Sequence, residues 1–451
     1  MNGIELRPLN IINQQQPPPQ QQQQQPPQQQ LPEKQNTIRL SQVINPNVAF
    51  LKSQHHQQQL IQAGRRYHAQ EIPPPEKKKD KGGEGKAETR VVYEKAHFFI
   101  DSRYKIVSMM GKGSYGTVCS AIDTYSKEKA MVAIKKVTSI FNKDVLLKRA
   151  IRELKLMTFF KGHKNIINLV DLDIVYRKPY DGLYCFQELA DYDLGRVIHS
   201  SIQFSEFHIQ SFFYQILCGL KYIHSADVIH RDLKPGNILV TSQGVLKICD
   251  FGLARGIGTQ YMNYSHKSSN ITNYVATRWY RAPELILSRK NYGKEIDMWS
   301  AGCVLAELYG RKPLFMAKDQ TEQIREICKV LGKPSSDVMT SYGSNGTWDF
   351  FASNNFHFET VEWRMVYPHA SPQACDLLLS LVCWDKKQRF TVGESIAHPF
   401  LRKVRNFDEE PIVGKQFDFS FEWKLHNENE LKSLLSEEVM QFKRERLVRI
   451  K

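Results

Sequence analysis

The sequence has few of the features that mark secreted, membrane-spanning or zinc-binding proteins. Its 8 cysteines are scattered, without a C-x-x-C pair or a cluster of histidines and cysteines at metal-ligand spacing, which argues against disulfides and structural zinc. The N-terminus has no apolar signal-like stretch, and no segment approaches the roughly 18 consecutive apolar residues of a membrane span. We therefore expect reduced thiols, no membrane partner, and a cytoplasmic and nuclear location.

Acidic residues are the minority charge. The chain has 62 Lys and Arg against 47 Asp and Glu, which gives a net charge of +15. The basic residues lie along the whole chain among acidic ones, whereas a nucleic-acid-binding face usually gathers them in one stripe. A DNA-binding regulator with a Gln-rich tail stays a rival hypothesis, but we expect no direct nucleic-acid partner.

Periodic apolar residues are scarce in residues 1–97. This part contains the tract NQQQPPPQQQQQQPPQQQ and the charged segment PPPEKKKDKGGEGK at Pro73–Lys86. Such a composition buries too little apolar surface to offset chain entropy, so we expect a disordered tail and linker. The lysines between 77 and 81 are interpreted as a solvated charge run, with a nuclear-import or docking signal as the alternative.

From residue 98 the pattern changes to that of a folded domain. The segments YKIVSMMGKGSYGTVCSAID and AMVAIKKV predict short strands around a glycine-rich turn. Helices follow, with two apolar stripes at three- and four-residue spacing: Leu147, Ile151 and Leu154, then Ile209, Phe213, Ile216 and Leu220. We predict an α+β fold with a β-rich first lobe at about 98–187 and a larger α-helical second lobe at about 191–401.

Residues 402–451 form a C-terminal extension with a helix of its own. Asn427 and Glu430 have the spacing of a helix N-cap and its reciprocal acid. An apolar stripe follows: Leu431, Leu434, Leu435, Val439 and Phe442. We expect this amphipathic helix to pack back on the body of the protein; the alternative is a free helix that binds a partner.

Three glycines in the first predicted hairpin, Gly111, Gly113 and Gly116, have the spacing G-x-G-x-x-G. Glycines let main-chain N–H groups approach phosphate oxygens. A dinucleotide-binding loop would open a helix at this point, but TVCSAID continues as a strand. The glycines therefore predict a hairpin lid over a nucleotide.

Lys135, in VAIK on a following strand, would lie under this lid on the same face as Ala133. Its flexible side chain needs an anionic partner, which Glu153 on the next predicted helix would provide. The alternative is a surface ion pair of Glu153 with Arg149, one helical turn away.

The segment VIHRDLKPGNILV, at Val228–Val240, has the chemistry of phosphoryl transfer. In this predicted loop Asp232 would accept a hydroxyl proton, Lys234 would neutralise the phosphoryl group in transit, and Asn237 would offer an oxygen to a metal. LKICDFGLAR follows as a strand that ends at Asp250, a second hard oxygen ligand for Mg²⁺. These groups supply the positioning and charge neutralisation that phosphoryl transfer requires.

The motifs together resemble those of a known family. The set GKGSYGTV, VAIK, HRDLKPGN, DFG and APE resembles the eukaryotic protein kinases over residues 104–401. Within them, TNYVATRWYRAPE, DMWSAGCVLAEL and IAHPFL are similar to the mitogen-activated protein kinases, and FDEEPIVGKQFDFSF resembles the C-terminal extension of that family. Residues 1–97 have no counterpart in it.

The resemblance implies a bilobal protein kinase fold and a Ser/Thr kinase that uses ATP and Mg²⁺. The implied catalytic residues are Asp232, Lys135, Lys234 and Asn237. The implied metal ligands are Asn237 and Asp250. The implied nucleotide site, with its hinge at 187–190, consists of Met110, Gly111, Lys112, Gly113, Ser114, Tyr115, Gly116, Thr117, Val118, Ala133, Lys135, Glu153, Gln187, Glu188 and Ala190.

The resemblance also implies a phosphorylation switch. An upstream dual-specificity kinase would phosphorylate Thr272 and Tyr274, which flank Asn273 where the family usually has Glu, Pro or Gly. The arginines implied to bind phosphothreonine are Arg152, Arg231 and Arg255, and those implied for phosphotyrosine are Arg278 and Arg281. Without phosphates these like charges would converge unpaired, which would hold the kinase off.

The expected partners follow from the same resemblance. Substrates would carry Ser or Thr before proline, and docking-motif proteins and phosphatases would bind an acidic patch: Asp408, Glu409 and Glu410, with Asn406 where another acid is frequent. A buried pair of Glu284 with Arg389 would brace the larger lobe. A cyclin-dependent kinase would lack the paired Thr-x-Tyr, and a pseudokinase scaffold is disfavoured because every catalytic position is filled.

Overall fold

A computed structural model gives the fold of the chain. The chain divides into two units, residues 1–37 and 38–451, and everything described belongs to the second. The structure describes residues 76–77, 90–113, 116–257, 278–288, 292–342, 345–354, 356–425 and 427–450. Within these residues no helix combines the length and the apolarity of a membrane span.

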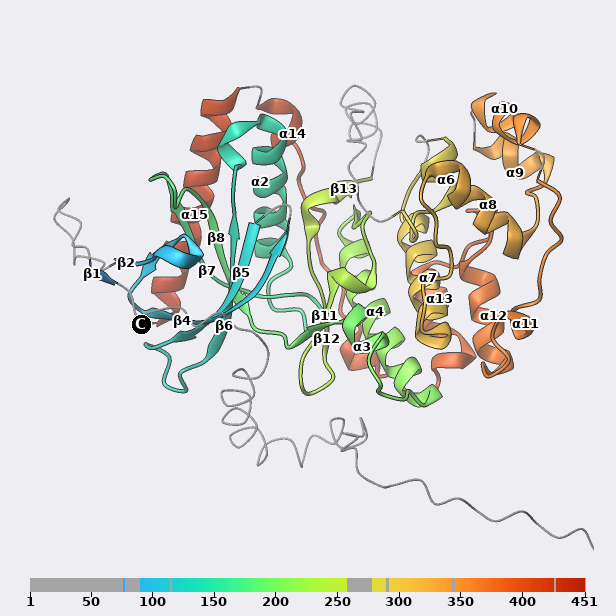
Figure 1. The fold of residues 1–451 in the computed structure, drawn as a ribbon, viewed down its shortest axis with the longest axis horizontal. Helices are drawn as coiled ribbons and strands as arrows, with labels where there is room; N and C mark the ends of the chain where they lie inside the picture. Colours follow the sequence, from blue (N-terminus) through green and yellow to red (C-terminus); the bar gives the residue numbers. More distant parts are fainter. Residues whose placement is uncertain are drawn as a thin grey trace, which may run out of the picture. The chain divides into compact units, whose positions relative to one another are not determined.

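Five antiparallel strands form the main sheet of the first lobe (Figure 1). Their order is β4-β5-β6-β8-β7, and their bounds are Tyr104–Gly113 (β4), Gly116–Asp123 (β5), Met131–Val137 (β6), Leu169–Val175 (β7) and Gly182–Glu188 (β8). Burial alternates along β6: Val132 and Ile134 are buried in an apolar core, while Lys135 is on the opposite face. The predicted β-rich first lobe is thus confirmed.

A small sheet extends the first lobe toward the N-terminus. Its strands are β1 (Glu76–Lys77), β2 (Arg90–Tyr93) and β3 (Phe98–Asp101), with a 3₁₀ turn η2 (Glu94–Ala96) between the last two. The predicted boundary of the tail at residue 97 is therefore wrong. The short run RVVY shows no periodicity, but pairing with β3 buries its apolar side chains.

Helix α2 (Asp144–Phe159) follows η3 (Ile140–Asn142) and packs beside the main sheet (Figure 1). Its predicted stripe of Leu147, Ile151 and Leu154 is buried. The neighbouring Arg152 and Glu153 are also buried, although both are charged. A helix that buries charge next to an apolar stripe needs partners for it, and these belong to the functional site.

The second lobe is mainly helical, as predicted. Its helices are α3 (Leu194–Ile198), α4 (Glu206–Ser225), α6 (Pro283–Leu287), α7 (Glu295–Gly310), α8 (Gln320–Leu331), α9 (Ser336–Ser341), α10 (Asn345–Ser353), α11 (Trp363–Val366), α12 (Pro372–Leu381), α13 (Val392–Ala397) and η6 (Pro399–Leu401). The predicted stripe of α4 is buried, and α4 packs against α7 and α13. These helices form one continuous apolar core.

An ion pair with no exposed surface braces this lobe. Arg389 donates through Nη1 and Nη2 to the two carboxylate oxygens of Glu284, at 2.6 and 3.2 Å. Arg389 also donates to the carbonyl oxygens of Glu295 and Cys383. Burial lowers the pKa of Arg389, but Glu284 raises it above its usual range, so the pair stays ionised. The paired charges implied by the family resemblance are therefore present.

The C-terminal extension runs from η7 (Phe407–Glu409) through α14 (Phe421–Lys424) to α15 (Glu428–Ile450). Asn427 Oδ1 accepts from Glu430 N at 2.9 Å, as the predicted cap requires. Leu431, Leu435 and Val439 are buried, and α15 packs on α2 and β7 (Figure 1). The prediction that this helix packs back on the body is confirmed.

Candidate active site

The glycine hairpin is the turn between β4 and β5. Gly113 pairs with Gly116 at its tip, and Ser114 and Tyr115 lie outside the described residues. Gly116 has φ +152°, and a Cβ there would lie 1.9 Å from Lys136 O, so a side chain does not fit. The other residues of the predicted lid flank the tip on the two strands: Met110, Gly111 and Lys112, and Thr117 and Val118.

Lys135 and Glu153 form an ion pair between the sheet and α2. Lys135 Nζ lies 2.5 Å from Glu153 Oε1. Burial lowers the pKa of the Lys135 ammonium, but the carboxylates of Glu153 and Asp250 raise it above its usual range. The ammonium is therefore charged and held in place, ready to contact an anion. Arg149, the alternative partner of Glu153, lies with Nη2 3.5 Å from Asp250 Oδ1.

Asp232, Lys234 and Asn237 meet at one carboxylate oxygen. Asp232 Oδ2 accepts from Lys234 Nζ at 2.7 Å and from Asn237 Nδ2 at 2.8 Å. All three lie on the loop between β10 (Val228–Ile229) and β11 (Ile238–Val240), where η4 (Pro235–Asn237) tightens the chain. Two donors fix Oδ2, which orients the other oxygen of Asp232 for a substrate hydroxyl.

Asn237 and Asp250 lie at the two ends of a β-hairpin, one before its first strand and the other after its second. β11 pairs with β12 (Leu246–Ile248), and Cys249 N donates to Asn237 O at 3.0 Å. Burial raises the pKa of Asp250, but Lys135 and Arg149, with His230 and Lys234, outweigh it and lower the pKa to about 2. Asp250 is therefore a carboxylate at any physiological pH.

The donor set fits Mg²⁺. Both hydrogen bonds of the Asn237 amide use Nδ2, so its oxygen is the remaining polar atom, and Asp250 adds an ionised carboxylate. Mg²⁺ prefers oxygen ligands and takes the rest of its coordination from phosphates and water. In the part of the chain that the structure describes, no group of three or more His, Cys, Asp or Glu offers another metal site.

The predicted hinge lies at the end of β8. Ala133 on β6 is opposite Gln187, which is buried, as is Ala190. Glu188 Oε1 lies 2.8 Å from Lys247 Nζ, so this side chain fastens β8 to β12. The main-chain N–H of Glu188 also has a partner, because it donates to Asn168 O at 3.1 Å.

The sequence motifs do not predict a role for Asp297, which organises the catalytic loop from the start of α7. Its carboxylate accepts from His230 N and Arg231 N, each at 2.8 Å, and lies 2.9 Å from His224 Nε2. Burial raises the pKa of Asp297, but His224 and His230 lower it overall. The sequence signal was an acid at the start of the apolar run DMWSAGCVLAEL.

Arg152, Arg231 and Arg255 gather in a group, here called the arginine cluster. Arg255 lies on β13 (Arg255–Gly256). Burial and then Arg152 lower the pKa of Arg255 to about 9, Arg231 adds to this, and Glu422 opposes it. Among the described residues Arg231 Nε is buried without a hydrogen-bond partner. The predicted switch residues, 272–274, lie outside the described residues.

The arginines expected to bind phosphotyrosine follow residues 258–277, which lie outside the described residues. Arg278 Nη1 donates to Lys318 O at 3.3 Å, and Trp279 Nε1 donates to Ala317 O at 3.0 Å. Arg281 is half-buried. These contacts attach the segment that carries both arginines to residues 317–318, just before α8.

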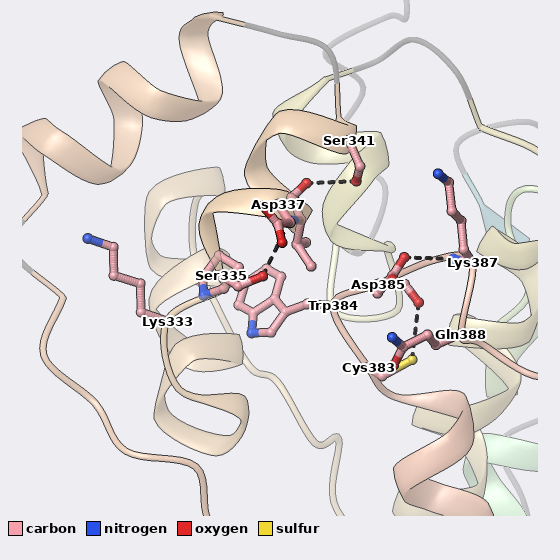
Figure 2. A pocket seen from close by; sticks show the side chains of 11 residues that line it. Lys333, Ser335, Asp337, Ser341, Cys383, Trp384, Asp385, Lys387 and Gln388 are labelled. Carbon is pink, nitrogen blue, oxygen red and sulfur yellow. Dashed lines mark hydrogen bonds between the residues drawn. The ribbon is translucent and has the colours of Figure 1, made fainter.

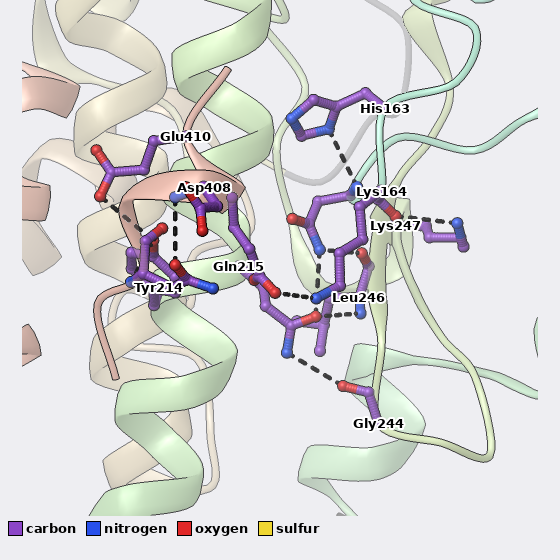
Figure 3. A network of polar contacts seen from close by, with 12 residues as sticks. His163, Lys164, Tyr214, Gln215, Gly244, Leu246, Lys247, Asp408 and Glu410 are labelled. Atoms are coloured by element: carbon purple, nitrogen blue, oxygen red, sulfur yellow. Dashed lines mark hydrogen bonds and ion pairs between the residues drawn. The ribbon is translucent and has the colours of Figure 1, made fainter. Parts of the chain in front are cut away.

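The predicted acidic docking patch is only partly a surface. The side chain of Glu410 is 3% exposed and accepts from Arg405 Nε at 2.8 Å and from Lys221 Nζ at 2.9 Å. It also accepts from Tyr214 Oη at 3.3 Å (Figure 3). The prediction that Glu410 meets docking partners is wrong, because internal cations already surround it. Asp408 is exposed.

Glu409 is partly exposed and also has a partner within the chain. Its Oε1 lies 2.5 Å from Lys164 Nζ, with the two side chains 30% and 49% exposed. Lys164 follows His163, which lies in the polar network of Figure 3. The predicted docking patch therefore exposes less acidic surface than the sequence indicates.

A pocket of about 480 Å³ opens at the end of α8, between residues 333–341 and 383–388 (Figure 2). Lys333 and Lys387 contribute to its lining, with Asp337 and Asp385 among the other polar groups. The pocket shares no residue with the predicted nucleotide, metal or switch sites. It is therefore separate from the chemistry described above.

Known proteins similar to this chain are protein kinases. The protein kinase domain family matches residues 104–401. The chain is 54% identical to the sporulation-specific mitogen-activated protein kinase SMK1 of Saccharomyces cerevisiae, over 80% of this chain and 93% of that protein. It is 46% identical to mitogen-activated protein kinase SLT2/MPK1 of the same yeast (77% and 71% covered) and 44% identical to spm1 of Schizosaccharomyces pombe (76% and 81% covered).

Proposed function

The chain belongs to the mitogen-activated protein kinase family, and on that premise we propose that it is proline-directed and is switched on by phosphorylation of Thr272 and Tyr274. Membership makes it a protein Ser/Thr kinase of mitogen-activated protein kinase signalling that uses ATP. The arginine cluster carries the proposal of a switch, because three cations from α2, the catalytic loop and β13 converge with excess positive charge.

The chemistry follows from the described contacts. Asp232 receives the proton of the substrate hydroxyl, with its orientation fixed by Asn237, and Lys234 stabilises the negative charge of the phosphoryl group in transit. Lys135, held by Glu153, positions the phosphates of ATP under the glycine hairpin. Mg²⁺ on Asn237 and Asp250 would supply further charge neutralisation.

The double variant Thr272→Ala, Tyr274→Phe tests the switch. Both proteins are incubated with an activating kinase, and transfer of labelled phosphate to a Ser-Pro peptide is measured. We expect the variant to lose most of the activity and to keep ATP affinity, because the nucleotide site is built from other residues. Equal activity of variant and wild type would contradict the proposal. A matched Ser-Ala peptide tests the preference for proline.

We further propose that Asp408 and Glu409 receive docking proteins and phosphatases and that the protein is cytoplasmic and nuclear. The internal partners of Glu409 and Glu410 support a weaker affinity for basic docking peptides than three free acids would give. Calorimetric titration with such a peptide, before and after Asp408→Asn, tests the surface, and a fluorescent fusion tests the location. Equal affinities, or exclusion from one compartment, would refute the respective statement.

A role in sporulation is a second, more specific candidate. It is favoured by the 54% identity to a kinase whose name is sporulation-specific, against 46% for SLT2/MPK1. Expression of this chain in Saccharomyces cerevisiae that lacks SMK1 tests it. Replacement of SMK1 in sporulating cells supports the role, and replacement of SLT2/MPK1 alone would contradict it.

A further inference from the structure

Glu422, on α14 of the C-terminal extension, is a buried acid that none of the kinase motifs includes. Its residue is 4% exposed, and its Oε1 accepts from Arg152 Nε. Lys148, one turn earlier on α2, donates from Nζ to Glu422 O at 2.7 Å. Lys155, three residues after Arg152, lies with Nζ 5.7 Å from the ring centroid of Phe421. One face of α2 thus contacts α14 through side chains on successive turns of the helix.

Arg152 joins this contact to the catalytic centre. Its Nη1 donates to Gly252 O at 2.5 Å, two residues after the metal ligand Asp250. The next residue on α2 is Glu153, which holds Lys135. A rotation or shift of α2 that moved Arg152 away from Glu422 would move Glu153 as well, since both are on the same rigid turn of helix.

The charges at this point do not balance. The cluster contains three guanidinium groups, and Glu422 is the carboxylate that acts on both Arg152 and Arg255 among the described residues. Burial raises the pKa of Glu422, but Arg152 and Arg255 lower it overall, so the group is ionised. Three guanidinium groups, with the ammonium of Lys148 beside them, and one carboxylate leave an excess of positive charge, which a phosphate dianion would reduce.

We propose that Glu422 is a positioning residue that holds Arg152, and with it α2, in the catalytic arrangement before Thr272 is phosphorylated. The inference rests on the proposed switch and deepens it. Glu422 supplies part of the negative charge in advance, and the phosphate supplies the remainder. Removal of Glu422 therefore makes the kinase more dependent on phosphorylation.

The test compares wild type, Glu422→Gln and Glu422→Asp, each in a phosphatase-treated form and in a form phosphorylated at Thr272 and Tyr274. In Glu422→Gln we expect kcat on a Ser-Pro peptide to fall about tenfold without phosphate and less than about twofold with it, because the phosphate then holds Arg152. KM for the peptide should stay unchanged. Glu422→Asp keeps the charge and should restore much of the unphosphorylated activity.

Glu438→Gln is the matched control. Glu438 on α15 pairs with Lys155 of α2, with the side chains 20% and 24% exposed, but it makes no described contact with the arginine cluster. Its loss should leave the ratio between the two forms unchanged. Measuring that ratio within each variant separates positioning from stability, which thermal unfolding reports independently.

Two results would overturn the inference. If Glu422→Gln lowered both forms by the same factor, Glu422 would be a structural residue only. If it raised the activity of the unphosphorylated form, Glu422 would compete with the phosphate and hold the kinase off. A wild type that phosphorylation does not activate would overturn the proposed switch itself, and a fall in unphosphorylated Glu422→Gln would still support positioning.

Discussion

The catalytic centre and the arginine cluster share α2 and the catalytic loop, but their charges are arranged differently. In the centre each cation has its own carboxylate, as in Lys135 with Glu153 and Lys234 with Asp232. In the cluster three arginines act on one another around Glu422. The difference indicates that the catalytic groups are held by ion pairs within the chain, whereas the cluster has excess positive charge, which the proposed phosphorylation would reduce.

The largest expected effect is a loss of activity after a substitution in the catalytic centre. Asp232→Asn should lower kcat by about a thousandfold, because the amide cannot accept the hydroxyl proton. The fold should persist, since Lys234 and Asn237 can still donate to the amide oxygen. Peptide phosphorylation and thermal unfolding measure the two quantities. Activity close to wild type would mean that another group is the base.

The brace of Arg389 with Glu284 extends the comparison to stability. Arg389→Leu should lower the free energy of unfolding by about 3–5 kcal/mol, because Glu284 is left charged and buried without its partner. The double variant with Glu284→Leu should recover much of this loss. Urea unfolding measures both. A single variant as stable as wild type would show that the pair is not the brace of the lobe.

A substitution in the arginine cluster should have the opposite effect on stability. Arg255→Gln removes one of three like charges, so the unphosphorylated protein should unfold at an unchanged or higher temperature. Its activation by phosphorylation should fall about tenfold, because a phosphate contact is lost. Arg364→Gln, at a side chain 76% exposed, is the control and should change neither quantity. A strongly destabilised Arg255→Gln would refute the charge imbalance.

A smaller effect is the pH dependence of stability that arises from His163, a buried histidine. Burial first, and then Lys247, lowers the pKa of His163 from 6.5 to about 4. The unfolded chain therefore takes up a proton between pH 6.5 and 4 that the folded protein does not, and the free energy of unfolding falls as pH drops through this window. His163→Phe keeps the ring stacked on Tyr222 and should flatten the slope. If the pH dependence of the free energy of unfolding stayed unchanged, it would arise from a group other than His163.

The motif residues were predictable because their chemistry is carried by short segments. The loop with Asp232 and Asn237, and the strand that ends at Asp250, have spacings that only a few turn geometries satisfy. The β-rich and helical lobes were predictable from apolar periodicity in the same way. Local patterns therefore gave the fold class and the groups for the chemistry.

What the sequence did not predict depends on contacts between distant residues. Asp297 holds the loop at His230 and Arg231, which lie 67 and 66 residues away in the chain. Glu410 is a buried group and not a docking acid, because it pairs with Lys221, which lies 189 residues earlier in the chain. Neither neighbour has a fixed spacing that a pattern could contain. The strand at residues 90–93 was missed because its partner, not its composition, makes it a strand.

The contacts of α2 with α14 and α15 can form only late in the synthesis of the chain. The partners of α2 lie 270 and 283 residues further along the chain, at Glu422 and Glu438. At 5–20 residues per second, a ribosome needs roughly 15–60 s between making the two parts. During that interval the first lobe has been synthesised, but the contacts of α2 with α14 and α15 cannot yet form. The complete set of contacts around Arg152 therefore forms only after α14 and α15 have been synthesised.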